Sequence, residues 1–143
     1  MENERLKIED WRLKIEDWRL KIAMKPNIVK DKSFAFALEI VKLARNLQAE
    51  KREFVLSKQV LRSGTAIGAL VREAEHAESK ADFIHKMSIA LKEANETRYW
   101  LELPYGAELI DKNNFDSLHP DSESLIKLLA AIVKSTKNNP LSH

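Results

Sequence analysis

Two pairs of side chains in this sequence have the spacing of metal ligands on a helix. Glu73 and His76 stand three residues apart, and Asp82 and His85 repeat this pattern. Residues three apart share one face of a helix, and Glu-x-x-His pairs hold the metals of di-iron four-helix bundles. Such a centre also needs carboxylates from facing helices near the middle of the bundle, whereas both pairs flank one predicted turn. We therefore predict no metal site and no cofactor, and interpret these residues as solvated.

Nothing else in the sequence resembles a catalytic centre. A nucleophile elbow, a phosphate-binding loop and a dinucleotide-binding glycine motif are all missing from it. The sequence contains no cysteine, which excludes thiolate chemistry and disulfides. Glu93 and Glu96 lie on one predicted helix and are interpreted as exposed charge. We predict that the protein is not an enzyme.

A stripe of positive charge is a stronger candidate for function. At 100° per residue, Lys58, Arg62 and Arg72 fall within about 80° of one another, and Lys51 points the same way. The stripe lies opposite the apolar positions of the predicted second helix. A line of cations suits a phosphate backbone, because binding releases counterions. We predict nucleic-acid binding here; the alternatives are an ordinary solvated helix face and a protein-binding adaptor without nucleic-acid contact.

A second apolar face occurs on the predicted third helix. It consists of Ile89, Tyr99, Trp100 and Leu103, which project away from the predicted core positions of that helix. Tryptophan beside aliphatic side chains is typical of interface cores. We predict a homo-oligomer interface; the alternative is that these residues pack under the first or fourth helix.

The length and composition of the chain indicate a single all-α domain. The 143 residues are 44% hydrophobic and include only three Gly and four Pro, which favours long helices around one core. A net charge of +2 argues against a wholly basic surface. No apolar run is long enough to cross a bilayer, and no signal peptide is recognisable, so we expect a cytoplasmic protein without a membrane partner.

Periodic apolar residues predict four helices, over about 33–48, 54–78, 80–103 and from the residues after Pro120 to about 137. The expected caps are Asp31 or Ser33, then Ser79 with Asp82, then Asp121 or Ser122. Pro104 is expected to kink or end the third helix. Short connections between the helices predict an antiparallel bundle. The expected core positions are, helix by helix, Ala37, Ile40, Val41, Ala44 and Leu47; Leu56, Val60, Ser63, Ile67, Val71 and Ala74; Phe83, Met87, Ala90, Ala94, Thr97 and Leu101; and Leu125, Leu128, Leu129, Ile132 and Val133.

Two glycines interrupt the predicted second helix. Gly64 and Gly68 stand four residues apart beside its apolar face. Glycine inside a helix costs about 1 kcal/mol relative to alanine. We therefore expect the backbone of another helix to approach closely there.

The heptapeptide LKIEDWR occurs twice in tandem, at Leu6–Arg12 and Leu13–Arg19. Its apolar spacing fits a coiled coil poorly, because a seam needs apolar residues three and four apart. We divide the chain into an appendage at 1–23, a bundle domain at 24–137 and a tail at 138–143. The alternative is that the appendage is a docking arm for a neighbouring subunit.

The sequence between Lys25 and Lys137 resembles the 23S rRNA intervening-sequence proteins. The resemblance is carried by the segments 59–63 (QVLRS), 65–69 (TAIGA), 82–84 (DFI) and 96–101 (ETRYWL). Leu70 and Val71 stand where such proteins usually carry Asn-Ile. The resemblance implies a left-handed up-down-up-down four-helix bundle that assembles into a ring, a homopentamer. Some relatives are similar to accessory proteins that bind a reverse transcriptase and nucleic acid, so these partners are expectations for this chain.

Overall fold

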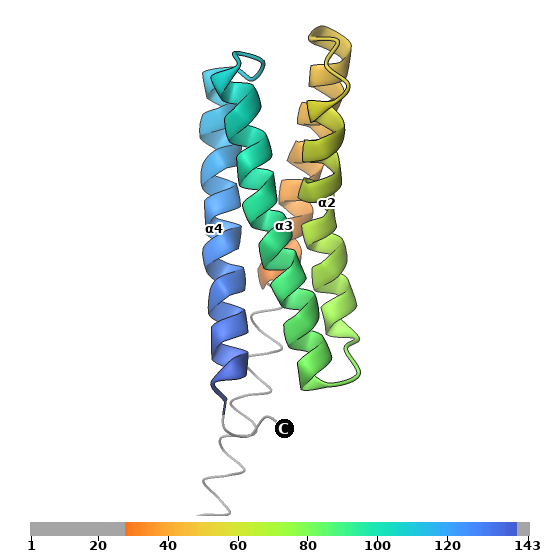
Figure 1. Cartoon of the computed structure of the whole chain (residues 1–143), viewed down its shortest axis with the longest axis vertical. Helices are drawn as coiled ribbons and strands as arrows, with labels where there is room; N and C mark the ends of the chain where they lie inside the picture. Colours follow the sequence, from red (N-terminus) through yellow and green to blue (C-terminus); the bar gives the residue numbers. More distant parts are fainter. Residues whose placement is uncertain (1–27, 140–143) are drawn as a thin grey trace, which may run out of the picture.

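The computed structural model describes residues 28–139, which form four helices and no strand. The first helix covers residues 28–50. It is followed by α2 (Leu56–Glu75), α3 (Lys80–Gly106) and α4 (Lys112–Lys137). The helices pack side by side as a bundle, with the α2–α3 and α3–α4 connections at opposite ends (Figure 1). The heptapeptide repeat and the expected domain boundary at residue 23 lie outside the described residues.

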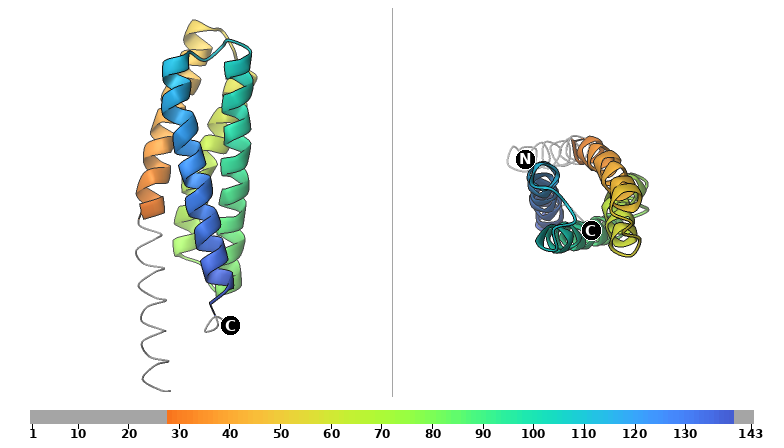
Figure 2. Two further views of the ribbon diagram at one scale, coloured as in Figure 1. Left: turned by 90° about the vertical axis from the view of Figure 1, so that its left-hand side faces the viewer. Right: turned by 90° about the horizontal axis from the view of Figure 1, so that it is seen from above.

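One apolar core fills the centre of this bundle. Viewed along the bundle, the first helix lies beside α2 and diagonally across from α3 (Figure 2). All six core positions predicted for α3 are buried, as are those predicted for α2 except Leu56, which is half-buried. On the first helix, Phe36 and Leu43 are buried, whereas the expected Ala37 and Val41 are only half-buried. That helix is therefore rotated slightly from the predicted orientation, so that its larger side chains enter the core.

Several buried hydroxyl groups lie among the apolar side chains, and they form hydrogen bonds there. Ser63 and Thr97 each donate to the carbonyl oxygen four residues earlier, at 3.0 and 2.7 Å. Ser57 accepts from the Gln48 amide at 3.1 Å, which links α2 to the first helix. A buried hydroxyl without a partner would cost about 1–3 kcal/mol. These small residues thus let helices approach while their polar atoms remain satisfied.

The first helix lies against both glycines, but at Gly64 the close neighbour is a side chain and not the backbone that was predicted. A Cβ added there would lie 2.7 Å from Cγ2 of Ile40 on the first helix. At Gly68 the nearest atom would be Oγ of Ser33, at 3.5 Å, which is ordinary contact. Gly64 is therefore the position where the first helix and α2 exclude any side chain.

Polar caps fix where two of the helices begin. The Ser79 hydroxyl accepts from the Asp82 backbone N–H at 3.0 Å, and the Asp82 carboxylate accepts from Glu78 N–H at 3.2 Å, which confirms the predicted start of α3. At the start of α2, the Glu53 carboxylate accepts from the backbone N–H groups of Leu56 and Ser57 at 2.7 and 3.1 Å. These bonds satisfy donors that a helix start leaves without intrahelical partners.

The predicted start of the fourth helix was wrong. Helix α4 begins at Lys112, because the Asp111 side chain caps it by accepting from Asn114 N–H at 2.7 Å. Pro120 lies inside the helix, where it removes one backbone hydrogen bond. The helix continues through it because Leu118 and Leu125, on either side, are both buried in the core. Helix α3 likewise passes through Pro104 and ends at Gly106, and α4 ends at Lys137 as predicted.

The caps predicted for the first helix were also wrong. Asp31 and Ser33 lie within that helix, which already includes residue 28. The Ser33 hydroxyl donates to the Lys30 carbonyl oxygen at 3.1 Å and is fully buried. Ser33 is therefore a small packing residue opposite Gly68 instead of a cap. No helix in the described part of the chain is long and apolar enough to span a bilayer.

Candidate interaction surfaces

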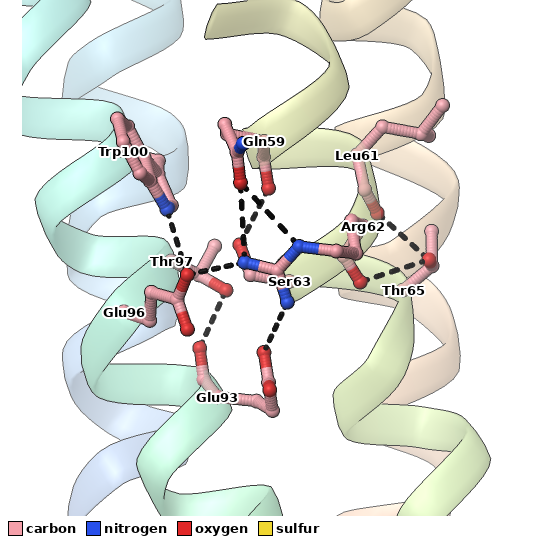
Figure 3. A network of polar contacts seen from close by, with 9 residues as sticks. All are labelled: Gln59, Leu61, Arg62, Ser63, Thr65, Glu93, Glu96, Thr97 and Trp100. Atoms are coloured by element: carbon pink, nitrogen blue, oxygen red, sulfur yellow. Dashed lines mark hydrogen bonds and ion pairs between the residues drawn. The ribbon is translucent and has the colours of Figure 1, made fainter.

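Arg62, predicted to bind phosphate, is the centre of a polar network between α2 and α3 (Figure 3). Its guanidinium donates to Glu93 at 3.3 Å and to Glu96 on α3, and to the Gln59 side chain on α2. The Trp100 indole N–H donates to the same Glu96 oxygen at 3.0 Å. The two carboxylates, which were interpreted as exposed charge, are therefore partly buried partners of Arg62.

This network stabilises the negative charge of Glu96. The hydrogen bond from Trp100 lowers the pKa of the Glu96 carboxyl, and the Arg62 guanidinium adds to this effect against the opposing effect of burial. Because Arg62 itself is exposed, each ion pair contributes little energy, and the network links α2 to α3 through several such contacts. Much of the positive charge of Arg62 is thus compensated by its own chain.

The other members of the basic stripe are not gathered into one site. Arg72 lies against the first helix, with its Cζ 5.4 Å from the centre of the Phe34 ring, a cation–π contact. Lys58 is exposed on α2, and Lys51 is exposed in the turn before it. Arg62 and Arg72 therefore lean toward opposite neighbours of α2. Nucleic-acid binding by the four residues stays a prediction.

The predicted interface residues of α3 divide into two kinds. Tyr99 and Leu103 are exposed, at 52% and 41%. Trp100 is half-buried and packs against the core, with its ring centre 4.9 Å from that of Tyr99 in an edge-on arrangement. Ile89 is half-buried as well. Of the four residues, only Tyr99 and Leu103 are thus exposed to solvent.

Several other large apolar side chains are exposed, and the sequence analysis missed them. Val55, at the start of α2, is 70% exposed. Because α2 begins and α3 ends at the same end of the bundle (Figure 1), we group the exposed Val55, Tyr99 and Leu103 as the α2–α3 patch. The first helix exposes Ile28, Phe34 and Leu38, which we call the first-helix patch. Helical periodicity could have identified the residues of the first helix, because they lie off its core stripe, as it identified Tyr99 and Leu103 on α3.

A groove adjoins the first-helix patch, on the side that faces α4. Its volume is about 320 Å³. The lining comes from both helices and consists of Lys32, Ala35, Phe36, Leu38, Glu39, Asp121, Ser124 and Leu125. The groove extends the apolar surface of Leu38 toward α4 and gives it a charged rim.

A histidine clamp joins α3 to α4 near the connection between them. Nε2 of His119 lies 2.8 Å from Glu102 on α3, and Nδ1 lies 3.1 Å from Glu123 on α4. The imidazole stacks on Phe115, which stacks on Tyr105 with ring centres 3.9 Å apart. The carboxylates face different ring nitrogens, so they do not converge on one point.

The two pairs with the spacing of metal ligands, Glu73 with His76 and Asp82 with His85, have other roles. Glu73 forms an ion pair with Lys86 at 3.5 Å, and Asp82 serves the cap of α3. His76 and His85 are exposed. Across residues 28–139, no group of three potential ligand side chains is placed to hold a metal ion.

Comparison with known proteins agrees with the segments noted in the sequence. Residues 25–131 match the 23S rRNA-intervening sequence protein family. A solved structure from Bacteroides thetaiotaomicron VPI-5482, described as a protein with unknown function from the S23 ribosomal protein family, is 57% identical to this chain. The similarity covers 77% of this chain and 98% of that one, with a TM-score of 0.75. Among curated proteins, none matches this chain. The match over residues 25–131 means that this chain belongs to the 23S rRNA-intervening sequence protein family.

Proposed function

We propose that this protein is a non-enzymatic scaffold whose protomers, antiparallel left-handed four-helix bundles, associate into a cytoplasmic homopentameric ring. The observation that carries the proposal is the presence of two separate exposed apolar patches. The α2–α3 patch includes Leu103, and the first-helix patch includes Leu38. The first helix and α3 occupy diagonal corners of the bundle (Figure 2).

The separation of the patches favours one kind of assembly. A two-fold dimer uses the same patch on both subunits, whereas a head-to-tail contact joins two different patches and forms a ring when the rotation between subunits closes. Two unlike apolar patches on different corners of one protomer fit the second arrangement. Each α2–α3 patch would then cover the first-helix patch of the next subunit, including Leu38 and the groove beside it.

A mixing experiment tests this pairing. Leu103→Glu and Leu38→Glu each place a carboxylate in one proposed interface, where burying an unpaired charge is costly. Each variant alone should be monomeric in light scattering. An equimolar mixture should form dimers, because each variant supplies the patch that the other lacks. Asn113→Glu, at an exposed site outside both patches, serves as control and should keep the wild-type mass. Full-size assemblies from either patch variant would contradict the proposal.

Nucleic-acid binding is a second proposal, with RNA, DNA or an enzyme such as a reverse transcriptase as the partner. Lys51 and Lys58 support it, because both are exposed and neither forms an ion pair within residues 28–139. Arg62 and Arg72 contribute less, since each already contacts a neighbouring helix. Retention of the wild type on heparin near 50 mM salt tests it, because phosphate-type binding is strong at low salt. Without retention, a protein-binding adaptor is the remaining function.

A further inference from the structure

The second half of α4 carries a row of lysines with no assigned role. Lys127, Lys134 and Lys137 are all exposed, and at 100° per residue they fall within about 80° of one another. We call them the α4 lysine row. None of the three forms an ion pair with another residue in the range 28–139. Their positive charge is therefore available to an external partner.

The sequence around this row contains no compensating acid. No Asp or Glu occurs after Glu123 in the described part of α4. Glu123 and the neighbouring Glu102 both contact His119. The row extends over about 15 Å, since a helix rises about 1.5 Å per residue. The uncompensated charge of the row contrasts with α2, where two carboxylates compensate the positive charge of Arg62.

Stabilisation of the helix end explains the presence of only two of the three lysines in the row. Cations in the last turn of a helix interact favourably with its dipole, and Lys134 and Lys137 occupy that position. The effect falls off beyond the last turn, so Lys127 gains nothing from it. Ala130 and Ala131, exposed between the lysines, are short enough to let a polymer backbone lie close to the helix.

The surroundings of the row indicate which polyanion it suits. Among residues 28–139, none of the large exposed apolar side chains lies on α4, so the helix that carries the row offers no such side chain for insertion into a lipid surface. Binding of single strands depends on aromatic side chains that stack on bases, and the second half of α4 has none. A row of ammonium groups without stacking partners suits the phosphates of a duplex, which are bound by charge alone.

We propose that the α4 lysine row binds the phosphodiester backbone of double-stranded nucleic acid without reading its bases. The proposal shares its ligand class with the second proposal above, but it depends neither on the α2 stripe nor on a ring. If the protomers do assemble, each subunit repeats the row, and weak contacts combine by avidity. This would allow a chain with a net charge of only +2 to hold a polyanion.

The test uses the full chain and labelled duplexes of about 20 base pairs, one RNA and one DNA, followed by fluorescence anisotropy across a salt series. The wild type should bind, with a slope of log K against log salt near −3 for each engaged protomer. Lys127→Glu combined with Lys134→Glu should weaken binding at least about tenfold and reduce the slope by about two. Binding to RNA alone or to DNA alone identifies the source of the backbone, and either supports the proposal.

The matched control places the same change of charge at two exposed lysines outside both proposed binding sites, by Lys42→Glu with Lys112→Glu, since these lysines already pair with Glu39 and Asp116. The proposal expects this control to bind nearly as the wild type does. An equal or greater loss of affinity in the control would overturn the proposal, and so would unchanged binding by the α4 variant. Failure of the wild type to bind at low salt would also overturn it, as would tighter binding to anionic lipid vesicles than to either duplex. Circular dichroism checks folding, and Lys127→Gln with Lys134→Gln replaces the α4 variant if that one misfolds. Light scattering of the same samples reports self-association separately, so the ring proposal stands or fails independently.

Discussion

Adding one methyl group at either glycine of α2 should have opposite effects at the two positions. In Gly64→Ala, the new Cβ would lie 2.7 Å from Cγ2 and 2.9 Å from Cγ1 of Ile40. Ile40 is fully buried, so its side chain cannot move aside into solvent. In Gly68→Ala, the nearest atoms lie at 3.5–3.6 Å, and nothing must move.

The expected magnitudes follow from two opposing terms. Replacing glycine by alanine inside a helix stabilises it by about 1 kcal/mol. Inserting a methyl group into a filled core costs about 1–3 kcal/mol. Gly64→Ala should therefore lower the free energy of unfolding by about 1 kcal/mol, whereas Gly68→Ala should raise it by about 0.5–1 kcal/mol, where only the helix term acts.

Urea unfolding of both variants, followed by circular dichroism, measures this difference. Ile40→Ala supplies a further check, because the methyl group at position 64 should then fill part of the new cavity. The double variant should be more stable than the sum of the single effects by about 0.5–3 kcal/mol. If Gly64→Ala proved as stabilising as Gly68→Ala, the close packing of the first helix on α2 would be refuted.

Three further changes test the caps, the polar network and a turn. Ser79→Ala removes the cap of α3 and should cost about 1 kcal/mol in urea unfolding, whereas Ser124→Ala, at an exposed site, should be neutral. The pKa of Glu96 is lowered in the folded state, so its stabilising effect is complete above its usual value of 4.5 and is lost as the pH falls through the lowered pKa. Glu96→Gln should therefore show a shallower loss of stability in that acid range, and an unchanged pH profile would contradict the network. Glu108 has a φ of 64°, so Glu108→Gly should raise the melting temperature by relieving about 1 kcal/mol of backbone strain.

Local signals in the sequence predicted α3 well. Its core residues follow an uninterrupted spacing of three and four, and the Ser79 cap acts within three residues. The start of α4 was missed because Pro120 was taken to precede the helix, whereas packing on both sides of the proline holds the helix together. The tendency of a single residue to break a helix is weak compared with tertiary contacts, and the sequence alone does not show those contacts.

The candidate surfaces were less predictable, because their partners are distant in sequence. Glu93 and Glu96 stand 31 and 34 residues from Arg62, and only the register of α2 against α3 brings them together. The clamp on His119 similarly depends on Glu102, 17 residues away on another helix. A helical projection shows that Arg62 points away from the core, but it does not show that a carboxylate on the neighbouring helix meets it.

The mass of the full chain in solution tests the proposed self-association most directly. Light scattering at micromolar concentration, on the wild type and without cross-linking, gives this mass independently of shape. Self-association predicts a single species several times heavier than the 16.5 kDa protomer, and the proposed ring predicts a pentamer. A wild-type mass equal to that of one protomer would contradict it.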